Sequence, residues 1–424
     1  MKDSCKNPLV KKIVYHITVK LASPLCISKG DGALTDNDVL VDGYGMPFIP
    51  GSSLAGAMRA YVGLDKSRDG IFGYEDMKTN KGRMSPLFVS DLFFKEGTVA
   101  TAVRDGVALD VNKTAKKGAK FDMEVVDTGA EGSFWMELNL RKADDADVLQ
   151  GQLDRIFAGW REKELRFGSK KTRGYGEIKL EKVRKKEFTA ENILQYKDMF
   201  LESPEKDDSW ETVDLNGISS DAMKFVTITL PLRLEGGISI RQYAAKKGEP
   251  DFVHITAAGE PVIPGTSFAG AIRHRMQEML ESFGAKNTGE ILDEIFGYVK
   301  EKEARSSNII ISECVLEGAR KLRMVRNGIS RFESGAKSGA LFEELSYIGG
   351  STKLEIRVRK TDTMKETVGL LLPVLKDVQN GFLAVGGQTA VGRGLFCGAG
   401  EIRMDSDLSE ADCLKEAVQA LRRE

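Results

Sequence analysis

Cysteine and histidine are scarce in this chain, and long apolar runs are missing. The 424 residues include five cysteines and three histidines, and no two cysteines form a CxxC pair. Without such pairs, the sequence indicates neither a structural zinc site nor a disulfide framework. No apolar run is long enough to cross a bilayer, and the N-terminus lacks the apolar segment of a signal peptide. We therefore expect a cytoplasmic protein without a membrane partner.

The charge is nearly balanced overall but unevenly distributed along the chain. The formal net charge is −1, which argues against indiscriminate binding to polyanions. Basic residues nevertheless crowd residues 113–120, 161–173 and 320–331, and acidic residues collect at 202–214. One such run is usually a solvated face. The place of each run in the fold therefore matters more than the sum of the charges.

A pattern of fifteen residues occurs twice. GMPFIPGSSLAGAMR starts at Gly45, and GEPVIPGTSFAGAIR starts at Gly259. Four further landmarks follow in the same order in both halves: IFGY, a Ser-acid pair after an apolar stretch, VRDGV or VRNGI, and a Gly-rich stretch reading GSKKTRGYG or GGQTAVGRG. Landmarks repeated in one order indicate a duplicated domain. We predict copies at 1–191 and 222–424, the second ending in a C-terminal helix, and an acidic linker at 192–221.

The pattern of each copy predicts an α+β fold. Alternating apolar residues in ITVKL and VTITLPLRL indicate half-buried strands that open the copies. The PGSS and PGTS pieces would supply Ser or Thr N-caps for a following helix. A strand, a long polar excursion, a strand, a helix and a last strand after the Gly-rich stretch complete the pattern. This β-α-β-β-α-β order is typical of a ferredoxin-like or RRM-like unit.

These motifs in this order resemble the RAMP superfamily of CRISPR-associated proteins. More narrowly, the chain resembles the type III backbone subunit that polymerises along a guide RNA, and its two copies resemble the double-backbone subunits of type III-D complexes. The resemblance implies two tandem RAMP domains, each with a thumb-like β-hairpin inserted in its polar excursion. It also implies antiviral defence in a ribonucleoprotein complex, with guide RNA, complementary target RNA and other type III effector subunits as partners.

The resemblance further implies where target RNA would be cut. The cutting residue of the family is an aspartate on the loop before the PGSS helix, and its pattern stands here as DNDVLVD, which identifies Asp36. In the second copy, Asp251 is the only aspartate before the helix, and both a catalytic and a turn role remain open for it. A lone carboxylate can accept a proton, or hold hydrated Mg²⁺ or Mn²⁺ through water and phosphate. Turn closure is the alternative for Asp36, and the role expected of Asp38 and Asp42.

Histidine offers little acid-base chemistry in this sequence. His254 lies near Asp251 and is a minor candidate for proton transfer. His16 and His274 are expected in the core or on the surface.

Contacts to the RNA backbone are expected at helix starts, Gly-rich loops and basic positions of the excursions. Bare amides and cations together suit phosphate, whereas solvation or turn geometry is the alternative for each residue alone. Phe121 and Phe332 are candidates to wedge against bases, with core packing as the alternative for Phe121. The predicted RNA-binding residues are Ser52, Ser53, Arg59, Lys113, Lys116, Lys117, Gly168, Lys170, Lys171, Arg173, Gly174, Arg273, Arg326, Gly387, Gln388 and Arg393.

Three functions compete on this basis. The first is a metal-dependent endoribonuclease subunit of an effector complex, and the second is a guide-RNA scaffold that cuts nothing. The third is a stand-alone enzyme that processes CRISPR transcripts, against which scarce histidine and long excursions count. A metabolic enzyme is disfavoured because the Gly-rich stretches have no GKS or GKT ending and precede a strand, where a nucleotide-binding loop would precede a helix.

Overall fold

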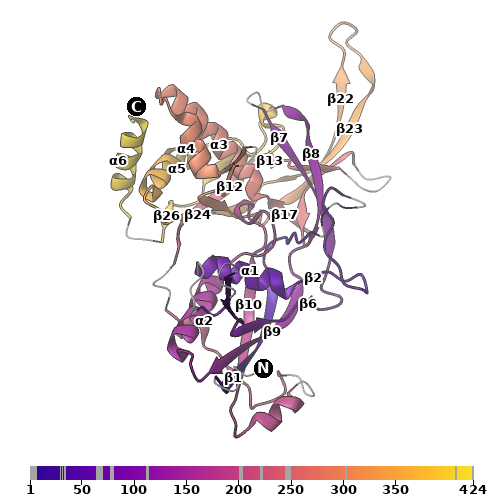
Figure 1. Ribbon diagram of the computed structural model, residues 1–424. Coiled ribbons are helices and arrows are strands. Elements are labelled where there is room, and N and C mark those ends of the chain that lie inside the picture. Colours follow the sequence, from indigo (N-terminus) through magenta and orange to yellow (C-terminus); the bar gives the residue numbers. More distant parts are fainter. Residues whose placement is uncertain are drawn as a thin grey trace. The chain divides into compact units, whose positions relative to one another are not determined.

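The computed structural model describes residues 7–28, 30, 32, 35–63, 70–76, 81–110, 114–199, 204–219, 223–243, 250–300, 303–405 and 408–422. The chain divides into two compact units. Unit 1 comprises Met1–Val103, Asp122–Lys171 and Tyr175–Met223, and unit 2 comprises Arg104–Phe121, Thr172–Gly174 and Lys224–Glu424. Helices and strands occur in both (Figure 1), so the predicted α+β class is confirmed. Within the described part of the chain, no helix is long and apolar enough to cross a membrane.

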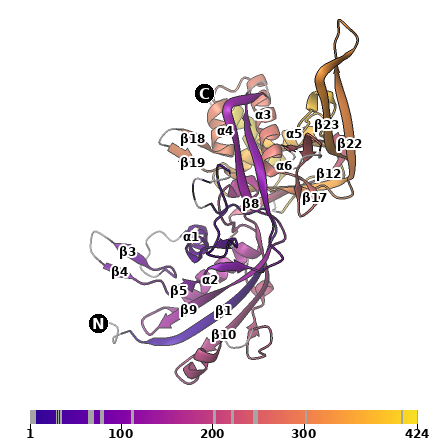
Figure 2. The same cartoon turned by 90° about the vertical axis from the view of Figure 1, so that its right-hand side faces the viewer.

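Unit 1 is built on a seven-stranded sheet. Its strand order is β11-β10-β1-β9-β6-β2, and β5 also pairs with β9. The strands are β1 (Leu9–Leu21), β2 (Phe48–Ile49), β5 (Leu87–Val89), β6 (Leu92–Phe94), β9 (Glu131–Arg141), β10 (Ile178–Phe188) and β11 (Glu211–Thr212). Helix α1 (Gly51–Val62) follows β2 along the chain, and helix α2 (Ala146–Arg161) follows β9 and precedes β10. In Figure 2 both helices lie beside the long strands β1, β9 and β10.

One face of this sheet carries the main core of unit 1. Leu54 and Met58 of α1 and Leu153 and Phe157 of α2 are buried in the same cluster as Ile17 of β1. The helical residues recur four positions apart, so each pair lies on a single helix face. The predicted strand at ITVKL is thus part of β1, and its alternate residues point into the core.

The opposite face of the sheet is covered by the segment that was predicted to be a linker. Met199 and Trp210 of this segment are each 4% exposed and pack against Val14 and Phe188. Lys186 of β10 lies 3.2 Å from Asp207. The segment also contains the turns η3 (Ile193–Asp198) and η4 (Leu215–Gly217). The segment therefore has packed structure within unit 1, because its apolar side chains are buried and its acidic residues lie opposite the basic strand β10.

Unit 2 repeats this architecture. Its main sheet has the order β20-β24-β12-β25, and β26 also pairs with β12. The strands are β12 (Phe225–Glu235), β20 (Ile309–Ile311), β24 (Ser351–Arg359), β25 (Leu395–Gly398) and β26 (Arg403–Met404). The helices are α3 (Gly265–Ser282), α4 (Thr288–Phe296), α5 (Met364–Gln379) and α6 (Glu410–Leu421). Each opening strand is therefore followed by the small-residue helix that the repeated fifteen residues encode.

Each copy also contributes one long antiparallel hairpin from its polar excursion. The hairpin strands are β7 (Thr101–Leu109) with β8 (Ala115–Val126), and β22 (Arg320–Ile329) with β23 (Ala336–Ile348). Phe332 at the second turn is 99% exposed, whereas the Phe121 ring packs over Gly106 within its own hairpin. Phe332 alone is thus exposed in the way that a base wedge requires.

Shorter elements complete the described chain. The remaining strands are β3 (Tyr74–Asp76), β4 (Lys81–Arg83), β13 (Gly237–Ile238), β14 (Arg241–Tyr243), β15 (Phe252–His254), β16 (Thr256–Ala257), β17 (Glu260–Ile263), β18 (Tyr298–Lys300), β19 (Glu303–Arg305) and β21 (Cys314–Val315). Two further turns, η2 (Lys171–Arg173) and η5 (Thr389–Val391), lie in the first and second Gly-rich loops, residues 168–176 and 386–394. Both loops therefore contain a short helical turn at the same place.

The starts of α1 and α3 differ from the sequence prediction. Their N-caps are Pro50 and Pro264, and neither helix has a side-chain bond from its cap residue, so the predicted Ser and Thr caps are wrong. In unit 1 the Asp91 carboxylate accepts the Gly51 N–H at 2.7 Å. A distant acidic residue thus satisfies an N–H group that a local cap would otherwise bind.

The C-terminal helix α6 packs on its own unit. The Ser409 hydroxyl accepts the Asp412 N–H and thereby caps the start of this helix. Cys413 and Ala417 are buried, and a side chain on Gly369 of α5 would lie 2.0 Å from the Cys413 carbonyl oxygen. The helix therefore approaches α5 closely because α5 carries a glycine at the contact.

Candidate functional site

Asp36 is exposed on the segment between β1 and β2 and is held against the returning strand of the first hairpin. Its N–H donates to Asp122 Oδ1 at 3.0 Å, and the Asp122 N–H donates to Asp36 Oδ2 at 2.9 Å. Further along, the Glu124 N–H donates to the Asn37 carbonyl, and Glu124 Oε2 accepts the Val39 N–H. The segment is thus bound to β8 at several points, and Asp36 and Asp122 each accept the other's N–H with a carboxyl oxygen.

The two neighbouring aspartates close turns, as expected. Asp38 is buried, and its Oδ1 accepts both the N–H and the hydroxyl of Thr35. Asp42 Oδ1 accepts the N–H groups of Tyr44 and Met46 at 2.8 and 2.9 Å. These bonds fix the local backbone, and Asp36 differs from both residues because its partner is distant in sequence.

Asp251 has the corresponding environment in unit 2. It is exposed, and its Oδ2 accepts the Glu343 N–H of β23 at 2.8 Å. The strand that follows it, β15, runs parallel to β23 and pairs Phe252 with Glu344. The Glu343 carboxylate itself lies 2.5 Å from Arg323. The second site therefore repeats the hydrogen bond of the first, but its neighbouring carboxylate is neutralised by an arginine.

The sequence analysis missed the acidic residues on the returning hairpin strands. A signal for them exists, because the pattern Ala-Lys-x-Gly-Ala-x-Phe-acid occurs at 115–122 and again at 336–343. The acidic residue that ends each copy of the pattern donates its N–H to the loop aspartate. Aligning the two excursions with each other would have found Asp122 and Glu343.

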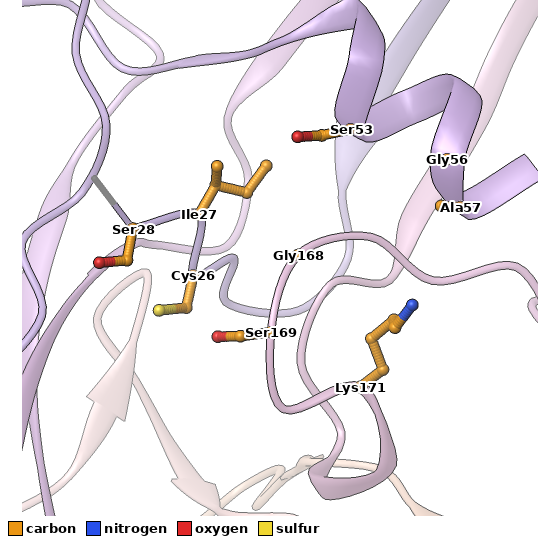
Figure 3. A pocket seen from close by; sticks show the side chains of 9 residues that line it. All are labelled: Cys26, Ile27, Ser28, Ser53, Gly56, Ala57, Gly168, Ser169 and Lys171. Carbon is orange, nitrogen blue, oxygen red and sulfur yellow. The ribbon is translucent and has the colours of Figure 1, made fainter. Parts of the chain in front are cut away.

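An open pocket of about 430 Å³ lies in unit 1. Its lining comes from residues 26–28, the first turns of α1 and the first Gly-rich loop (Figure 3). Ser53, Ser169 and Lys171 provide polar groups, and the Lys171 side chain extends toward the helix. The pocket therefore brings together the predicted residues Ser53, Gly168 and Lys171 from two distant parts of the sequence.

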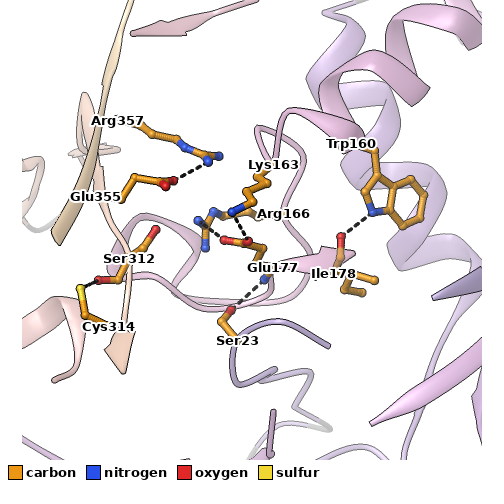
Figure 4. Close-up of polar contacts among 10 residues, drawn as sticks. All are labelled: Ser23, Trp160, Lys163, Arg166, Glu177, Ile178, Ser312, Cys314, Glu355 and Arg357. Carbon is orange, nitrogen blue, oxygen red and sulfur yellow. Dashed lines mark hydrogen bonds and ion pairs between the residues drawn. The ribbon is translucent and has the colours of Figure 1, made fainter. Parts of the chain in front are cut away.

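A buried ion pair closes the base of the first Gly-rich loop. The Arg166 side chain is 1% exposed and lies 2.8 Å from Glu177 Oε2, while Lys163 Nζ lies 3.6 Å from the other oxygen. The Glu177 N–H also donates to Ser23 Oγ at 2.9 Å (Figure 4). The ends of the loop are thus fixed, so the amides between them keep a defined orientation.

The other predicted residues of the first copy are mostly accessible. Lys170 is half-buried, and Gly174 is buried with no space for a side chain, which would lie 2.8 Å from the Ile311 carbonyl oxygen. Lys113 lies outside the described residues. The exposed members of the set are Ser52, Arg59, Lys116, Lys117, Lys171 and Arg173.

The predicted arginines of the second copy already have protein partners. Arg273 lies 3.7 Å from Asp293, and Arg393 directs Nη2 to the Met324 sulfur at 3.0 Å. Arg326 is half-buried on β22 and contacts the same sulfur at 3.6 Å. These cations are therefore more restrained than the exposed lysines of the first copy.

The second Gly-rich loop repeats the backbone of the first. Gln388 has φ +58°, and Lys170 has φ +55° at the matching position. The Gly387 N–H donates to the Ser239 carbonyl at 2.7 Å, and Gln388 Nε2 donates to Glu344 Oε2 at 2.7 Å. The loop is therefore fastened to Glu344 of β23 through the Gln388 side chain and to Ser239 through its backbone.

His254 is part of the core and has no access to substrate. Its ring is 3% exposed; Nδ1 accepts the Ile240 N–H, and Nε2 lies 3.0 Å from the Val262 carbonyl. Burial lowers the pKa of His254 to about 4, although the bond to Val262 and the charge of Glu344 act to raise it. A ring with both nitrogens occupied cannot shuttle protons, so the minor catalytic role is wrong.

Comparison with known proteins agrees with the repeat that the geometry displays. No curated protein matches the chain. The family model of the RAMP superfamily matches twice, over residues 18–179 and 231–397. The first match contains α1, α2 and the β7–β8 hairpin, and the second contains α3, α4, α5 and the β22–β23 hairpin. Together the matches span well over half of the 424 residues. The chain therefore belongs to the RAMP superfamily, whose domain it contains in two tandem copies.

Proposed function

We propose that this protein is a double backbone subunit of a type III CRISPR effector complex, which holds a guide RNA and cuts complementary target RNA at Asp36 and Asp251. Membership of the RAMP superfamily implies a CRISPR-associated, RNA-binding role. One observation carries the proposal of two cuts: each copy fastens an exposed loop aspartate to its hairpin by the same carboxylate-to-backbone bond. Two equivalent carboxylates suit a target strand that passes the two copies in turn.

The chemistry assigned to each aspartate is proton acceptance. Cleavage of RNA needs the 2′-hydroxyl in line with the phosphorus, a base for its proton and compensation of charge on the phosphoryl oxygens. A carboxylate has two oxygens with several acceptor positions. The bond from the Asp122 N–H uses one position on Asp36 Oδ2, so the same group can still accept the hydroxyl proton. The hairpin orients the carboxylate while it does so.

The donor set around Asp36 fits Mg²⁺ or Mn²⁺. Both are hard cations that prefer carboxylate oxygens, and Mg²⁺ is commonly held by one or two carboxylates together with waters and substrate phosphates. The carboxyls of Asp36 and Asp122 meet that requirement. Among the described residues, no group of three His, Cys, Asp or Glu side chains could hold a metal by itself. When bound there, the cation would offset charge on the phosphoryl oxygens.

The first Gly-rich loop and the start of α1 are proposed to hold the RNA backbone. Lys171 and Ser53 line the pocket of unit 1, and the loop amides are fixed by the Arg166–Glu177 pair at its base. Phosphate contacts of this kind set the register without reading sequence. We propose a weaker grip for the second loop because Gln388 and Arg393 are bonded within unit 2.

The test is cleavage of a guide-complementary RNA by the reconstituted complex in Mg²⁺. Asp36→Ala and Asp251→Ala should each abolish a different product, and the double variant should abolish both, with guide binding intact. Asp42→Ala is the matched control, because it removes a carboxylate of the same segment that only closes a turn. If all variants gave the wild-type products, the chain would be a guide-RNA scaffold and another subunit would cut.

A further inference from the structure

Glu344 is a fully buried carboxylate on β23 of unit 2, between the second Gly-rich loop and the segment of Ser239 and Arg241. Its exposed fraction is 0%. Glu344 Oε1 accepts the Ser239 hydroxyl and the Arg241 Nε–H, the latter at 3.3 Å, and Oε2 accepts the Gln388 amide at 2.7 Å. A charge in such a place costs several kcal/mol unless it is fully paired. These three donors provide that pairing.

The carboxylate remains ionised under ordinary conditions. Burial acts to raise the pKa of Glu344, but the Ser239 hydroxyl, the charge of Arg241 and the Gln388 amide outweigh it, and the pKa lies below its usual value. Burial lowers the pKa of the neighbouring His254, so its ring is neutral and adds no charge beside Glu344. The bond to Gln388 is therefore charge-assisted, and such bonds are stronger than those between neutral groups.

Glu344 connects the second Gly-rich loop with the segment of Asp251. The side chain holds Gln388, which has left-handed backbone geometry in that loop. Glu343, which precedes Glu344 in β23, donates its N–H to the Asp251 carboxylate. The backbone of Glu344 pairs with Phe252. Two successive residues of β23 thus join the loop and the segment of Asp251.

The first copy supplies an internal comparison. The repeated excursion pattern places Met123 where the second copy has Glu344, and Met123 is also buried, at 4% exposed. Met123 has no carboxylate to accept a bond from Lys170, the counterpart of Gln388. The architecture therefore forms with an apolar residue at this position, so folding alone does not require a charged one.

We propose that Glu344 is a positioning residue that couples the second Gly-rich loop to Asp251, so that RNA seated on this loop controls cleavage at Asp251. The inference rests on the proposed cleavage by Asp251. RNA that displaces Gln388 or presses on the loop shifts β23, and with it the N–H group that orients the carboxylate. In the first copy the matching residue is Met123, whose side chain offers no carboxylate for such a bond.

The test uses the reconstituted complex with saturating target RNA in single-turnover reactions. Glu344→Met installs the residue of the first copy, and Gln388→Ala removes the partner in the loop without touching the core. Both should slow the Asp251-dependent cut by about tenfold or more, because small misplacements of a catalytic group cost that much. The Asp36-dependent cut should be unchanged. Glu344→Gln should restore part of the rate, since an amide of the same length still bonds Gln388 once that side chain turns.

Each other result counts against the coupling in a distinguishable way. If both variants cut at the Asp251 site at the wild-type rate while Asp251→Ala abolishes that product, the coupling is wrong and the proposed function stands. If both products are lost together, Glu344 has a structural role and the coupling is again wrong. If Asp251→Ala removes no product, the second cutting centre and the coupling fall together. Met123→Leu is the matched control in the first copy and should change neither cut.

Discussion

Acid should destabilise unit 2 through His254. The buried ring has a pKa of about 4 in the folded chain, against 6.5 for an ordinary histidine. Since the Ile240 N–H donates to Nδ1, the ring proton is on Nε2 and is donated to the Val262 carbonyl. The folded state therefore prefers the neutral ring, whereas the unfolded chain binds a proton as the pH falls below 6.5.

The sign and the size of the effect follow from linkage. Between about pH 6.5 and pH 4 the unfolded state binds more protons, so the free energy of unfolding falls as acid is added. At full effect the difference in pKa corresponds to about 3 kcal/mol, of which about 2 kcal/mol is lost between about pH 7.5 and pH 5. Above this range both states are neutral, and below it both are charged, so His254 adds no further dependence.

The assay is urea unfolding of wild type and His254→Gln at about pH 7.5 and pH 5, followed by circular dichroism. Glutamine cannot titrate, so the variant should lose about 2 kcal/mol less than wild type between the two conditions. Tryptophan fluorescence reports on unit 1 alone, because Trp135, Trp160 and Trp210 all lie there. At each pH, wild type and His254→Gln should therefore show the same fluorescence transition.

His274→Gln is the matched control, since that ring is on an accessible helix face and not in the core. Losing one backbone partner makes the His254 variant less stable at both pH values, and only the difference between them is diagnostic. Equal acid losses in wild type and His254→Gln would refute a buried neutral ring and reopen a proton-transfer role for His254.

Three further predictions concern stability and RNA binding. Gly176→Ala should destabilise unit 1 by about 2 kcal/mol or more in thermal unfolding, because φ is +73° and the new Cβ would lie 1.8 Å from a carbonyl oxygen. Gly270→Ala should instead stabilise unit 2 by about 0.5–1 kcal/mol, because Gly270 lies on helix α3 with open space around it. Glu177→Ala should cost about 3 kcal/mol in fluorescence-detected urea unfolding, since it removes the acid from the buried Arg166; a cost below about 1 kcal/mol would show that the pair behaves as a surface pair. Lys171→Ala should lower the salt dependence of guide-RNA binding by about 0.7 in the log–log slope, and an unchanged slope would place the phosphate elsewhere.

The duplication, the repeated helices and the turn residues were predictable from the sequence because their signals are local. The repeated Gly, Pro and small-residue skeleton marks α1 and α3, and alternation of apolar residues marks β1 and β12. The turn roles of Asp38 and Asp42 also followed from nearby residues, because their bonds span only a few positions. Patterns of this kind depend on backbone geometry within one element, which neighbouring residues largely determine.

The connections among these segments came from the tertiary structure. Asp36 and Asp122 are 86 positions apart, and Glu344 is 44 positions from Gln388. Periodicity shows that a residue faces the inside of a sheet, but it does not show which segment lies opposite. The partner depends on strand order and register, which are set by burial over the whole unit. The sequence by itself thus determined the two copies and their loop aspartates. Only the fold decided that the hairpins hold both carboxylates and that Glu344 fastens the second Gly-rich loop, because these contacts join residues far apart in the chain.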